Sequence, residues 1–410
     1  MPKGHVLTGL DIGTNNIKIL VAQKNPGEAD LEVLDQEQAL ASGIRKGVVV
    51  NAEEVTNIIS LCVRKIEERL GREIDGVYVN LSGSHIFTTS SHGLVSVSRA
   101  DQKISPEDVT RVIQNAQTFS LPSNKEILEI FPKEFIIDGE KGIKEPLGME
   151  GVRLEVETMV LGGFSPYIRN TTQAVLAADL QIDDQILSPL ASARAVLTDK
   201  EKELGVAVLD IGGGTSELAV FEEGSLIHLA IFPLGANYIT YDIAIGLKTD
   251  VDIAEKIKVE LGTCVFKKTD KKRVIRIERL GGEHLLEPLV FPRKALVEIV
   301  GARVSEIFDQ TNKELRKISK LGKLPAGIVL TGGGARLSRI TELARKELKL
   351  PVRIGIPRGF FPAQEDPSFS TVCGLVLIGA DTEIREGLSI SSFTKGIGER
   401  LKKIFRVFIP

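Results

Sequence analysis

The sequence contains few cysteines, no long apolar run and no strong excess of charge of either sign. Its three cysteines, Cys62, Cys264 and Cys373, lie far apart in the 410-residue chain and form no Cys-x-x-Cys motif. This spacing predicts buried, reduced thiols rather than a disulfide framework or a thiolate metal site. A cytosolic location is the expectation that follows.

The N-terminus lacks the features of a targeting segment. Residues 1–6, MPKGHV, lead into no long apolar core and no small-residue cleavage site, so we expect no signal peptide. No apolar run is long enough to span a bilayer. If the chain reaches a membrane, it is expected to lie on the cytoplasmic surface.

The charge balance gives no indication of a nucleic-acid partner. The 52 lysines and arginines are opposed by 55 acidic residues, for a formal net charge of −3. A strong basic field is therefore absent. The hydrophobic fraction, 42%, is that of a globular protein with enough apolar side chains for two domains.

An Asp-Ile-Gly turn between two apolar runs occurs twice, about half a chain apart. The first run, Val6–Leu10, ends in Asp11-Ile12-Gly13, and Ile17–Val21 resumes a strand. The second turn lies in VAVLDIGGGTSELAV, residues 206–220. The recurrence predicts two similar halves, and the alternation of strands with helices predicts the α/β class.

A third glycine-rich turn follows the apolar run Ile328–Leu330. Here Gly332-Gly333-Gly334 leads into a segment with helical spacing from Leu337 onward. This turn is therefore expected to join a strand to a helix, unlike the two hairpins.

The chemistry of these turns suits a nucleotide triphosphate. Glycines let backbone N–H groups approach phosphates closely, and carboxylates hold magnesium through water. Asp11 and Asp210 would share that metal, while Lys18 could reach the β- and γ-phosphates as a point charge. The third turn would receive adenine and ribose at a helix N-terminus. The residues of these turns expected to bind ATP are Asp11, Gly13, Thr14, Asn15, Asn16, Lys18, Asp210, Gly212, Gly213, Gly214, Thr215, Gly332, Gly333, Gly334 and Arg336.

The order of the three turns resembles that of the actin, heat-shock chaperone and sugar kinase superfamily. Leu10–Lys18, Leu209–Val220 and Ile328–Ile340 are similar to its two phosphate motifs and its adenosine motif. Ile186–Leu197 and Asp366–Ala380 resemble its connecting helices, the latter with glycines for close packing. The resemblance implies an actin-like fold, with two related α/β domains around a cleft that binds ATP and Mg²⁺.

The resemblance also bears on individual residues. It implies that Glu255 and Lys258 contact ribose and adenine, although a solvated helix face is an equal alternative. Polymerising relatives place Gln or Glu where this chain has Ser188, and a serine activates water poorly. We therefore expect slow or negligible ATP hydrolysis and assign no catalytic residue. His85, in a Gly-Ser-His turn, is expected to be a hydrogen-bonded turn residue.

Within the superfamily, the chain most resembles the bacterial cell-division family FtsA. The segments 77–86, VYVNLSGSHI, and 233–244, PLGANYITYDIA, carry this likeness, which covers nearly the whole chain. It implies subdomain 1A at 1–78 and 166–204, an SHS2-like subdomain 1C at 79–165, 2A at 205–247 and 301–380, and 2B at 248–300. A polar linker, 381–392, and an amphipathic helix, 393–410, would follow.

The last segment has a basic amphipathic pattern. Its apolar residues follow one helical face, and basic residues fill the remainder, opposed by Glu399. This pattern predicts an interfacial anchor for anionic lipid, with a terminal helix docked on the core as the alternative. The residues expected at the membrane are Phe393, Ile397, Leu401, Lys402, Lys403, Ile404, Phe405, Arg406 and Phe408.

The FtsA resemblance further implies partners. Family members form filaments through subdomain 1C, tether the FtsZ polymer to the inner membrane at the division site and recruit later division proteins. Subdomain 2B receives the C-terminal peptide of FtsZ, and we expect Arg293, Lys294 and Arg303 to contact it. For the cluster of basic residues at 267–279, a solvated charged hairpin is the default interpretation.

Two other functions stay open at this point. A PilM-like pilus-assembly scaffold shares the fold but docks a peptide from a membrane partner, and the basic C-terminal helix speaks against it. A small-metabolite kinase would suit the Asp11-Ile12-Gly13-Thr14 turn. Such a kinase needs a carboxylate base at the substrate hydroxyl, and no residue is evidently placed for that role.

Overall fold

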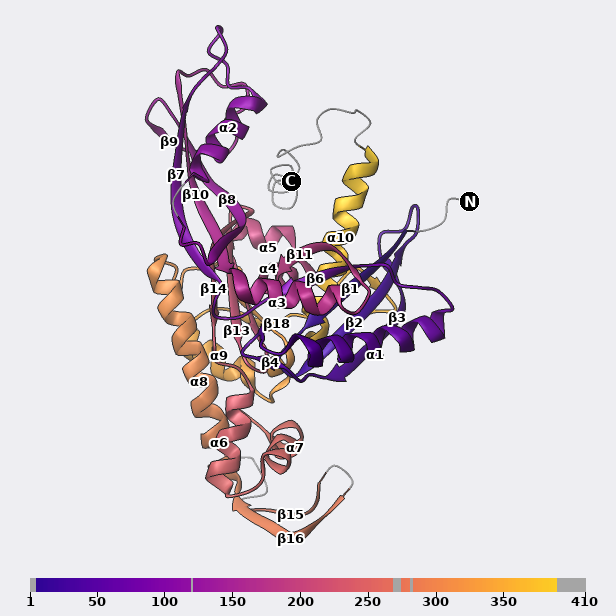
Figure 1. Ribbon diagram of the computed structural model, residues 1–410. Coiled ribbons are helices and arrows are strands. Elements are labelled where there is room, and N and C mark those ends of the chain that lie inside the picture. The colour runs from indigo at the N-terminus through magenta and orange to yellow at the C-terminus, as the bar shows by residue number, and fades with distance from the viewer. Residues whose placement is uncertain (1–4, 119–120, 268–273, 281–282, 389–410) are drawn as a thin grey trace.

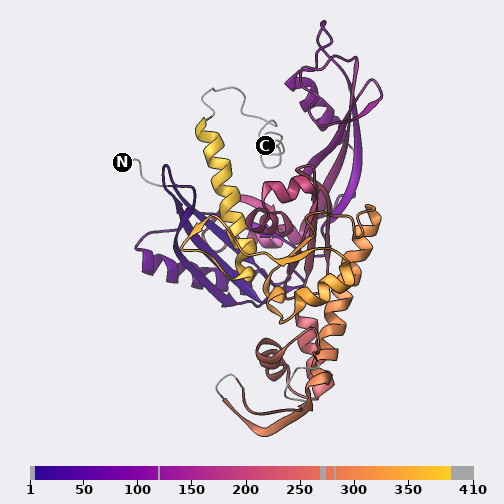
Figure 2. The same cartoon turned by 180° about the vertical axis from the view of Figure 1, so that it is seen from behind.

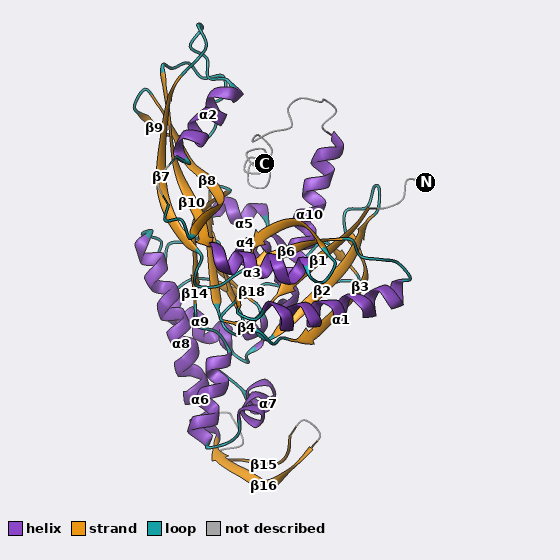
Figure 3. Ribbon diagram, viewed as in Figure 1, coloured by secondary structure: helices purple, strands orange, loops and turns teal. Residues whose placement is uncertain are grey.

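A computed structural model describes residues 5–118, 121–267, 274–280 and 283–388. Two mixed sheets with helices packed around them form the centre of the molecule (Figure 1). An insert rich in strands extends from one end, and helices with a two-stranded hairpin extend from the opposite end (Figure 3). The mixed α/β class predicted from the sequence is confirmed.

The first sheet has the strand order β11-β6-β1-β2-β3-β19. The strands β1, β2 and β3 form an antiparallel meander, while β6 and β11 add in parallel to the edge of β1. Apolar residues of α1 and α3 pack on one face of this sheet. The bounds are β1 His5–Ile12, β2 Asn16–Lys24, β3 Leu31–Leu40, β6 Gly76–Leu81, β11 Gln181–Leu187, β19 Phe360–Phe361, α1 Ala52–Leu70 and α3 Ser165–Leu176, with the small hairpin β4 Ile44–Arg45 and β5 Val48–Val49.

The second sheet has the order β14-β13-β12-β17-β18 and repeats the pattern of the first. Its three antiparallel strands are again followed by parallel ones. Both Asp-Ile-Gly turns therefore occupy equivalent hairpins, as the internal repeat predicts. The bounds are β12 Val206–Ile211, β13 Ser216–Glu222, β14 Ser225–Phe232, β17 Ile328–Thr331, β18 Val352–Ile354, α5 Asp199–Leu204, α6 Asn237–Leu247, α8 Arg293–Lys317 and α9 Ile340–Leu348.

Two helices, α4 (Ser188–Val196) and α10 (Ser370–Leu388), pack closely against each other. A Cβ at Gly374 would lie 1.8 Å from the carbonyl oxygen of Ala191, so only glycine fits at this crossing. A Cβ at Gly379 would lie 2.6 Å from the ring of Tyr78 on β6. The expected close packing around these glycines is confirmed, and Figure 2 shows α10 from the side opposite to Figure 1.

The strand-rich insert has the sheet order β7-β10-β8-β9 and one helix, α2. Its ends meet, because Phe87 pairs with Gly162 across β7 and β10. Ser105 caps α2 as expected: its hydroxyl accepts from the backbone N–H of Asp108, and its own N–H donates to the Asp108 carboxylate. The bounds are β7 Phe87–Ser96, α2 Pro106–Ala116, β8 Lys125–Ile137, β9 Glu140–Ile143 and β10 Arg153–Phe164.

The insert at the opposite end contains α7 (Val251–Leu261) and the hairpin of β15 (Val274–Leu280) and β16 (Glu283–Pro292). Helices α6 and α7 pack together, and α6 also packs on α8. Part of the expected basic cluster, residues 268–273, lies outside the described residues.

Several expectations need correction. The helix α10 continues to Leu388, so the first part of the expected linker 381–392 is helical. The third glycine turn enters a short 3₁₀ helix, Gly333–Arg336, and α9 begins only at Ile340 after Arg339 adopts φ 62°. Neither ring nitrogen of His85 has a hydrogen-bond partner, and its ring packs edge-on against Tyr167. Burial lowers the pKa of His85 to about 4, so this ring is neutral.

The expected amphipathic segment 393–410 lies outside the described residues. Within the part of the chain that the structure describes, no helix is long and apolar enough to cross a membrane.

Candidate functional site

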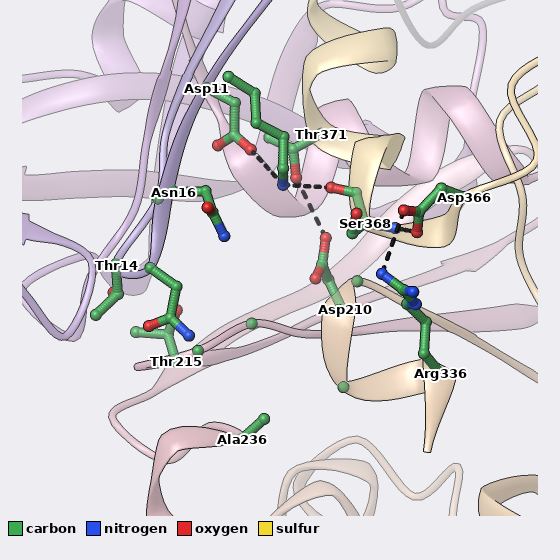
Figure 4. A pocket seen from close by; sticks show the side chains of 18 of the residues that line it. Asp11, Thr14, Asn16, Asp210, Thr215, Ala236, Arg336, Asp366, Ser368 and Thr371 are labelled. Atoms are coloured by element: carbon green, nitrogen blue, oxygen red, sulfur yellow. Dashed lines mark hydrogen bonds and ion pairs between the residues drawn. The ribbon is translucent and has the colours of Figure 1, made fainter. Parts of the chain in front are cut away.

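A cavity of about 480 Å³ lies where the two sheets face each other, and the three glycine turns line it (Figure 4). It contains every residue expected to bind nucleotide except Gly214. A Cβ at Gly214 would lie 2.6 Å from the hydroxyl of Thr14, so this glycine brings the two hairpin loops close together. The sequence did not indicate several other lining residues, notably Asn80, Ser82, Glu217, Ser368 and Thr371.

The first loop is held by backbone and side-chain hydrogen bonds. The N–H of Gly13 donates to Asn16 O at 3.1 Å, which closes the turn. The hydroxyl of Thr14 accepts from Gly47 N at 2.9 Å, so the β4–β5 hairpin supports this loop. Asn15 and Asn237 exchange two amide hydrogen bonds of 2.8 and 2.6 Å, which link the first half to α6 of the second.

The second loop is held from behind by the residues that precede α6. Ala236 N and Asn237 N donate to the carbonyl oxygens of Gly212 and Gly213 at 2.8 and 2.9 Å. A Cβ at Gly235 would lie 2.5 Å from Gly213 O, so no larger residue fits there without moving the loop. These bonds and the lack of space at Gly235 hold the second loop against the start of α6.

The third turn depends on the conformation of Gly332, whose φ is 80°. A Cβ at this position would lie 2.1 Å from a carboxylate oxygen of Asp210, so both backbone conformation and space require glycine. Its N–H donates to Pro367 O at 3.1 Å, which ties the turn to the segment before α10. Arg336 forms an ion pair with Asp366 at 3.4 Å at the mouth of the site.

Carboxylates concentrate at the floor of the cavity. Lys18 Nζ lies 3.6 Å from Asp11 Oδ2 and donates to Ser368 O at 2.5 Å. Asp210 Oδ2 accepts from the hydroxyls of Ser192 and Thr371 at 2.5 and 3.2 Å. Burial raises the pKa values of Asp11 and Asp210, and Lys18 opposes the rise. The site therefore favours the arrival of positive charge.

Within the described ranges, no three His, Cys, Asp or Glu side chains converge closely enough to hold a metal ion. A metal here would need water or phosphate oxygens among its ligands, which suits Mg²⁺ because it retains water and binds one or two carboxylates. The donor set fits the expected role of Asp11 and Asp210 through water.

Glu255 and Lys258 both line the cavity from α7. Lys258 is buried, and its Nζ lies 2.6 Å from Glu255 Oε2 and donates to the Thr240 hydroxyl at 2.9 Å. A solvated helix face, the alternative reading, is therefore wrong for Lys258. The side chain of Glu255 remains 41% exposed.

Ser188 also lines the cavity, but its hydroxyl hydrogen is already donated. It donates to Leu81 O at 3.2 Å and accepts from Asn80 Nδ2 at 3.0 Å. Next to this pair, the hydroxyl of Ser82 donates to the carboxylate of Glu217 across the two halves. The burial of Glu217, with Asp210 and Asp11 nearby, raises its pKa to about 8. The sequence carried one signal for it, its place two residues after Thr215 in the second turn.

The residues expected to meet a partner peptide share the helix α8 but do not form one cluster. Arg303 donates through Nε and Nη2 to Asp242 at 2.7 and 3.0 Å, and it also pairs with Glu306. Arg293 and Lys294 lie at the start of the helix, roughly 15 Å away along its axis. Lys294 makes an exposed pair with Glu298, and Arg293 Nε is buried without a hydrogen-bond partner.

The repeated sheets and the cleft between them define a protein of the actin-like class. Among solved structures, the PilM–PilN type IV pilus biogenesis complex aligns with a TM-score of 0.64 at 16% identity, over 91% of this chain and 98% of that chain. MreB5 of Spiroplasma citri bound to ADP aligns with a TM-score of 0.57 at 14% identity, over 94% and 99%. At such identities the likeness shows the fold.

Sequence relatives then identify the family. The family described as "Cell division protein FtsA" matches residues 207–374, and "SHS2 domain inserted in FTSA" matches residues 83–161. The FtsA proteins of Pseudomonas aeruginosa and Bacillus subtilis are 36% and 34% identical to the chain, over 95% and 92% of it and over 92% and 84% of their own lengths. That of Escherichia coli K12 is 31% identical over 98% of both. The chain belongs to the FtsA family of cell division proteins.

Proposed function

We propose that this cell division protein binds ATP with Mg²⁺ in the cleft and acts as a membrane-tethered, filament-forming scaffold. The observation that carries the nucleotide part is the convergence of three glycine turns on one cavity with buried carboxylates at its floor. The two hairpin loops line this cavity from both halves, and glycine-rich loops of this kind suit the phosphates of a nucleotide.

In this proposal, Asp11 and Asp210 hold Mg²⁺ through water, and Lys18 exchanges its contact with Asp11 for the phosphates. Burial raises the pKa values of these two carboxylates, and a bound cation would favour their ionised forms. Glu255 and Lys258 line the part of the cavity that would receive the nucleoside.

Calorimetric titration with ATP, with and without Mg²⁺, tests this directly. Binding should require the metal for full affinity, and Asp210→Asn should weaken the dependence on Mg²⁺ more than the affinity for metal-free ATP. If intact protein shows no heat of binding at millimolar ATP, the nucleotide proposal is wrong.

The tether has three parts in our proposal. The segment 393–410 binds anionic lipid on the cytoplasmic face of the inner membrane at the division site. The insert that matches the SHS2 domain mediates filament contacts. The α7–α8 end receives the C-terminal peptide of FtsZ, and the assembled protein helps to recruit later division proteins. The FtsA family membership supports this assignment.

The peptide site can be tested through Arg303. Because this guanidinium already pairs with Asp242 and Glu306, a peptide carboxylate would have to compete for its donors. Arg303→Glu should lower affinity for an FtsZ C-terminal peptide at least tenfold in fluorescence anisotropy. Lys346→Glu, on the exposed face of α9, is the control and should bind as before. Unchanged affinity in Arg303→Glu would remove this residue from the site.

A further inference from the structure

One of the residues that line the cavity, Glu217, has a carboxylate oxygen without a hydrogen-bond partner. Glu217 is 5% exposed and lines the cavity together with both phosphate-type loops. Its Oε1 accepts from the hydroxyls of Ser82 and of Thr215, the latter at 3.3 Å. Its Oε2 is buried and has no hydrogen-bond partner. A buried acceptor without a partner calls for an explanation, and a bound water or a catalytic role would supply one.

Glu217 lies near Ser188, and Ser188 is the position at which polymerising relatives carry a side chain that orients the attacking water. Ser188 occupies that position, but its hydroxyl already contacts Leu81 and Asn80. Leu81 is followed directly by Ser82, which holds Glu217. Ser188 and Glu217 therefore both contact the short segment Asn80–Ser82 at the end of β6. Of the two side chains, Glu217 is the one with an oxygen that has no hydrogen-bond partner.

The other two buried carboxylates of the cleft, those of Asp11 and Asp210, already have polar partners. Asp11 pairs with Lys18, and Asp210 accepts from Ser192 and Thr371. Glu217 pairs in register with Asp210 across β12 and β13, so its side chain lies on the same face of the sheet. Glu217 belongs to the second half of the molecule, whereas Ser82, its hydrogen-bond partner, belongs to the first. The position of the Glu217 side chain therefore depends on contact between the two halves.

We infer that Glu217 is the residue that orients and deprotonates the attacking water in ATP hydrolysis, in place of Ser188. This inference rests on the proposed binding of ATP in the cleft. Water bound at Oε2 forms the new bond to the γ-phosphorus, and the bond from that phosphorus to the β–γ bridging oxygen breaks. The electron pair leaves with ADP, and the proton of the water passes to Glu217 and then to the released phosphate. Glu217 must be ionised to accept this proton, and a cation held at Asp11 and Asp210 would favour its ionised form by lowering the pKa that these two carboxylates help to raise.

The role of Ser82 follows from the same geometry. Its hydrogen bond holds Oε1 and leaves Oε2 as the carboxylate oxygen without a partner. Separation of the two halves would break this bond. Hydrolysis should therefore be coupled to closure of the cleft, while ATP binding to the loops should not depend on it.

The test uses the full chain and compares Glu217→Gln with Glu222→Gln. Glu222 lies further along the same strand, outside the cavity, and pairs with Lys320. Single-turnover phosphate release should fall about 100-fold in Glu217→Gln, the range expected when a general base is lost, and stay unchanged in Glu222→Gln. ATP affinity, measured calorimetrically, should stay within about threefold in both. Ser82→Ala, which keeps the carboxylate, should give an intermediate rate.

A second readout separates this role from a structural one. Without nucleotide, Glu217 faces the charge of Asp210 and Asp11, so Glu217→Gln should melt at the same or a higher temperature than the parent. A large drop in melting temperature would instead mean that the side chain serves mainly to hold the fold, and would overturn the inference. So would ATP-binding protein that releases no phosphate above background, or a Glu217→Gln variant that hydrolyses normally. Absence of ATP binding in the parent chain would reject the proposed function itself.

Discussion

Gly235 is not part of any glycine-rich turn, yet it determines the shape of the second loop. The carbonyl oxygens of Gly213 and Gly212 would lie 2.5 and 2.6 Å from a Cβ at this position. Both are backbone atoms, and both already accept hydrogen bonds from the residues that follow Gly235. Neither can move without opening the loop.

We therefore predict that Gly235→Ala lowers ATP affinity more than tenfold while the far-ultraviolet circular dichroism spectrum stays that of the parent. Gly246→Ala, at the end of α6, is the matched control. A Cβ there would meet the far end of the flexible Ile299 side chain, which can rotate away. Equal affinities for ATP in the two variants would show that the loop tolerates displacement.

Single residues also show where sequence reasoning succeeds. The glycines of the three turns, and the aspartates of the first two, could be found because each turn is local and follows its strand directly in the sequence. The bond between Ser82 and Glu217 joins residues 135 positions apart and has no local pattern. The same holds for His85, whose turn sequence suggested a hydrogen bond but whose ring became buried against Tyr167.

At the scale of elements, α2 shows how much one helix start can contribute. Ser105 and Asp108 satisfy each other's backbone N–H groups in a capping box. In the isolated insert, residues 84–164, Ser105→Ala should lower the free energy of unfolding by about 1 kcal/mol in urea denaturation. Ser123→Ala, on an exposed loop of the same insert, should change it by less than about 0.5 kcal/mol.

The same carboxylate gives the insert a dependence on pH. Burial alone would raise the pKa of Asp108, but hydrogen bonds from Ser105, Arg111 and Ser98 outweigh it and lower the pKa below its usual value. The unfolded chain therefore binds a proton near pH 4 before the folded insert does, and stability is lost as the pH falls below about 4. Asp108→Asn should be less stable at pH 7 and should show a flatter profile between pH 5 and 3. A parent insert equally stable at pH 5 and 3 would contradict this.

The end of α10 is determined by tertiary contacts that the local sequence pattern does not show. Polar residues from Asp381 onward read as a linker, but tertiary contacts extend the helix. Asp381 accepts two hydrogen bonds from Arg194 of α4, at 2.7 and 3.0 Å, and the Thr382 hydroxyl donates to Ile378 O. An ion pair from a distant helix could not be anticipated from the local composition, whereas α2 could, because its cap lies within four residues.

At the scale of the whole molecule, the strand-rich insert and the β15–β16 hairpin lie at opposite ends, on either side of the two central sheets (Figure 1). The turns of both central sheets line the cavity. The surfaces that we propose for self-association and for a partner peptide would thus be separated in space. A scaffold with this arrangement can bind its neighbours and its partner at once. If residues 393–410 bind lipid as proposed, the strength of membrane binding would depend on how many chains are joined.

Membrane binding should consequently rise steeply with protein concentration. One C-terminal segment, with a net of four basic charges, gains roughly 4 kcal/mol from an anionic surface plus the contribution of its apolar face, which is reversible for a single chain. Linked segments bind far more tightly because each later contact is intramolecular.

In co-sedimentation with phosphatidylglycerol-rich vesicles and ATP, we expect a threshold concentration for membrane binding of the full chain and no pelleting for a chain that ends at Leu388. Removal of residues 84–164 should abolish the threshold but keep weak binding, because the lipid segment remains while the proposed filament contact is lost. The full chain and the chain without residues 84–164 both keep the lipid segment. If binding rises in simple proportion to concentration, and equally in these two proteins, each chain binds the membrane alone.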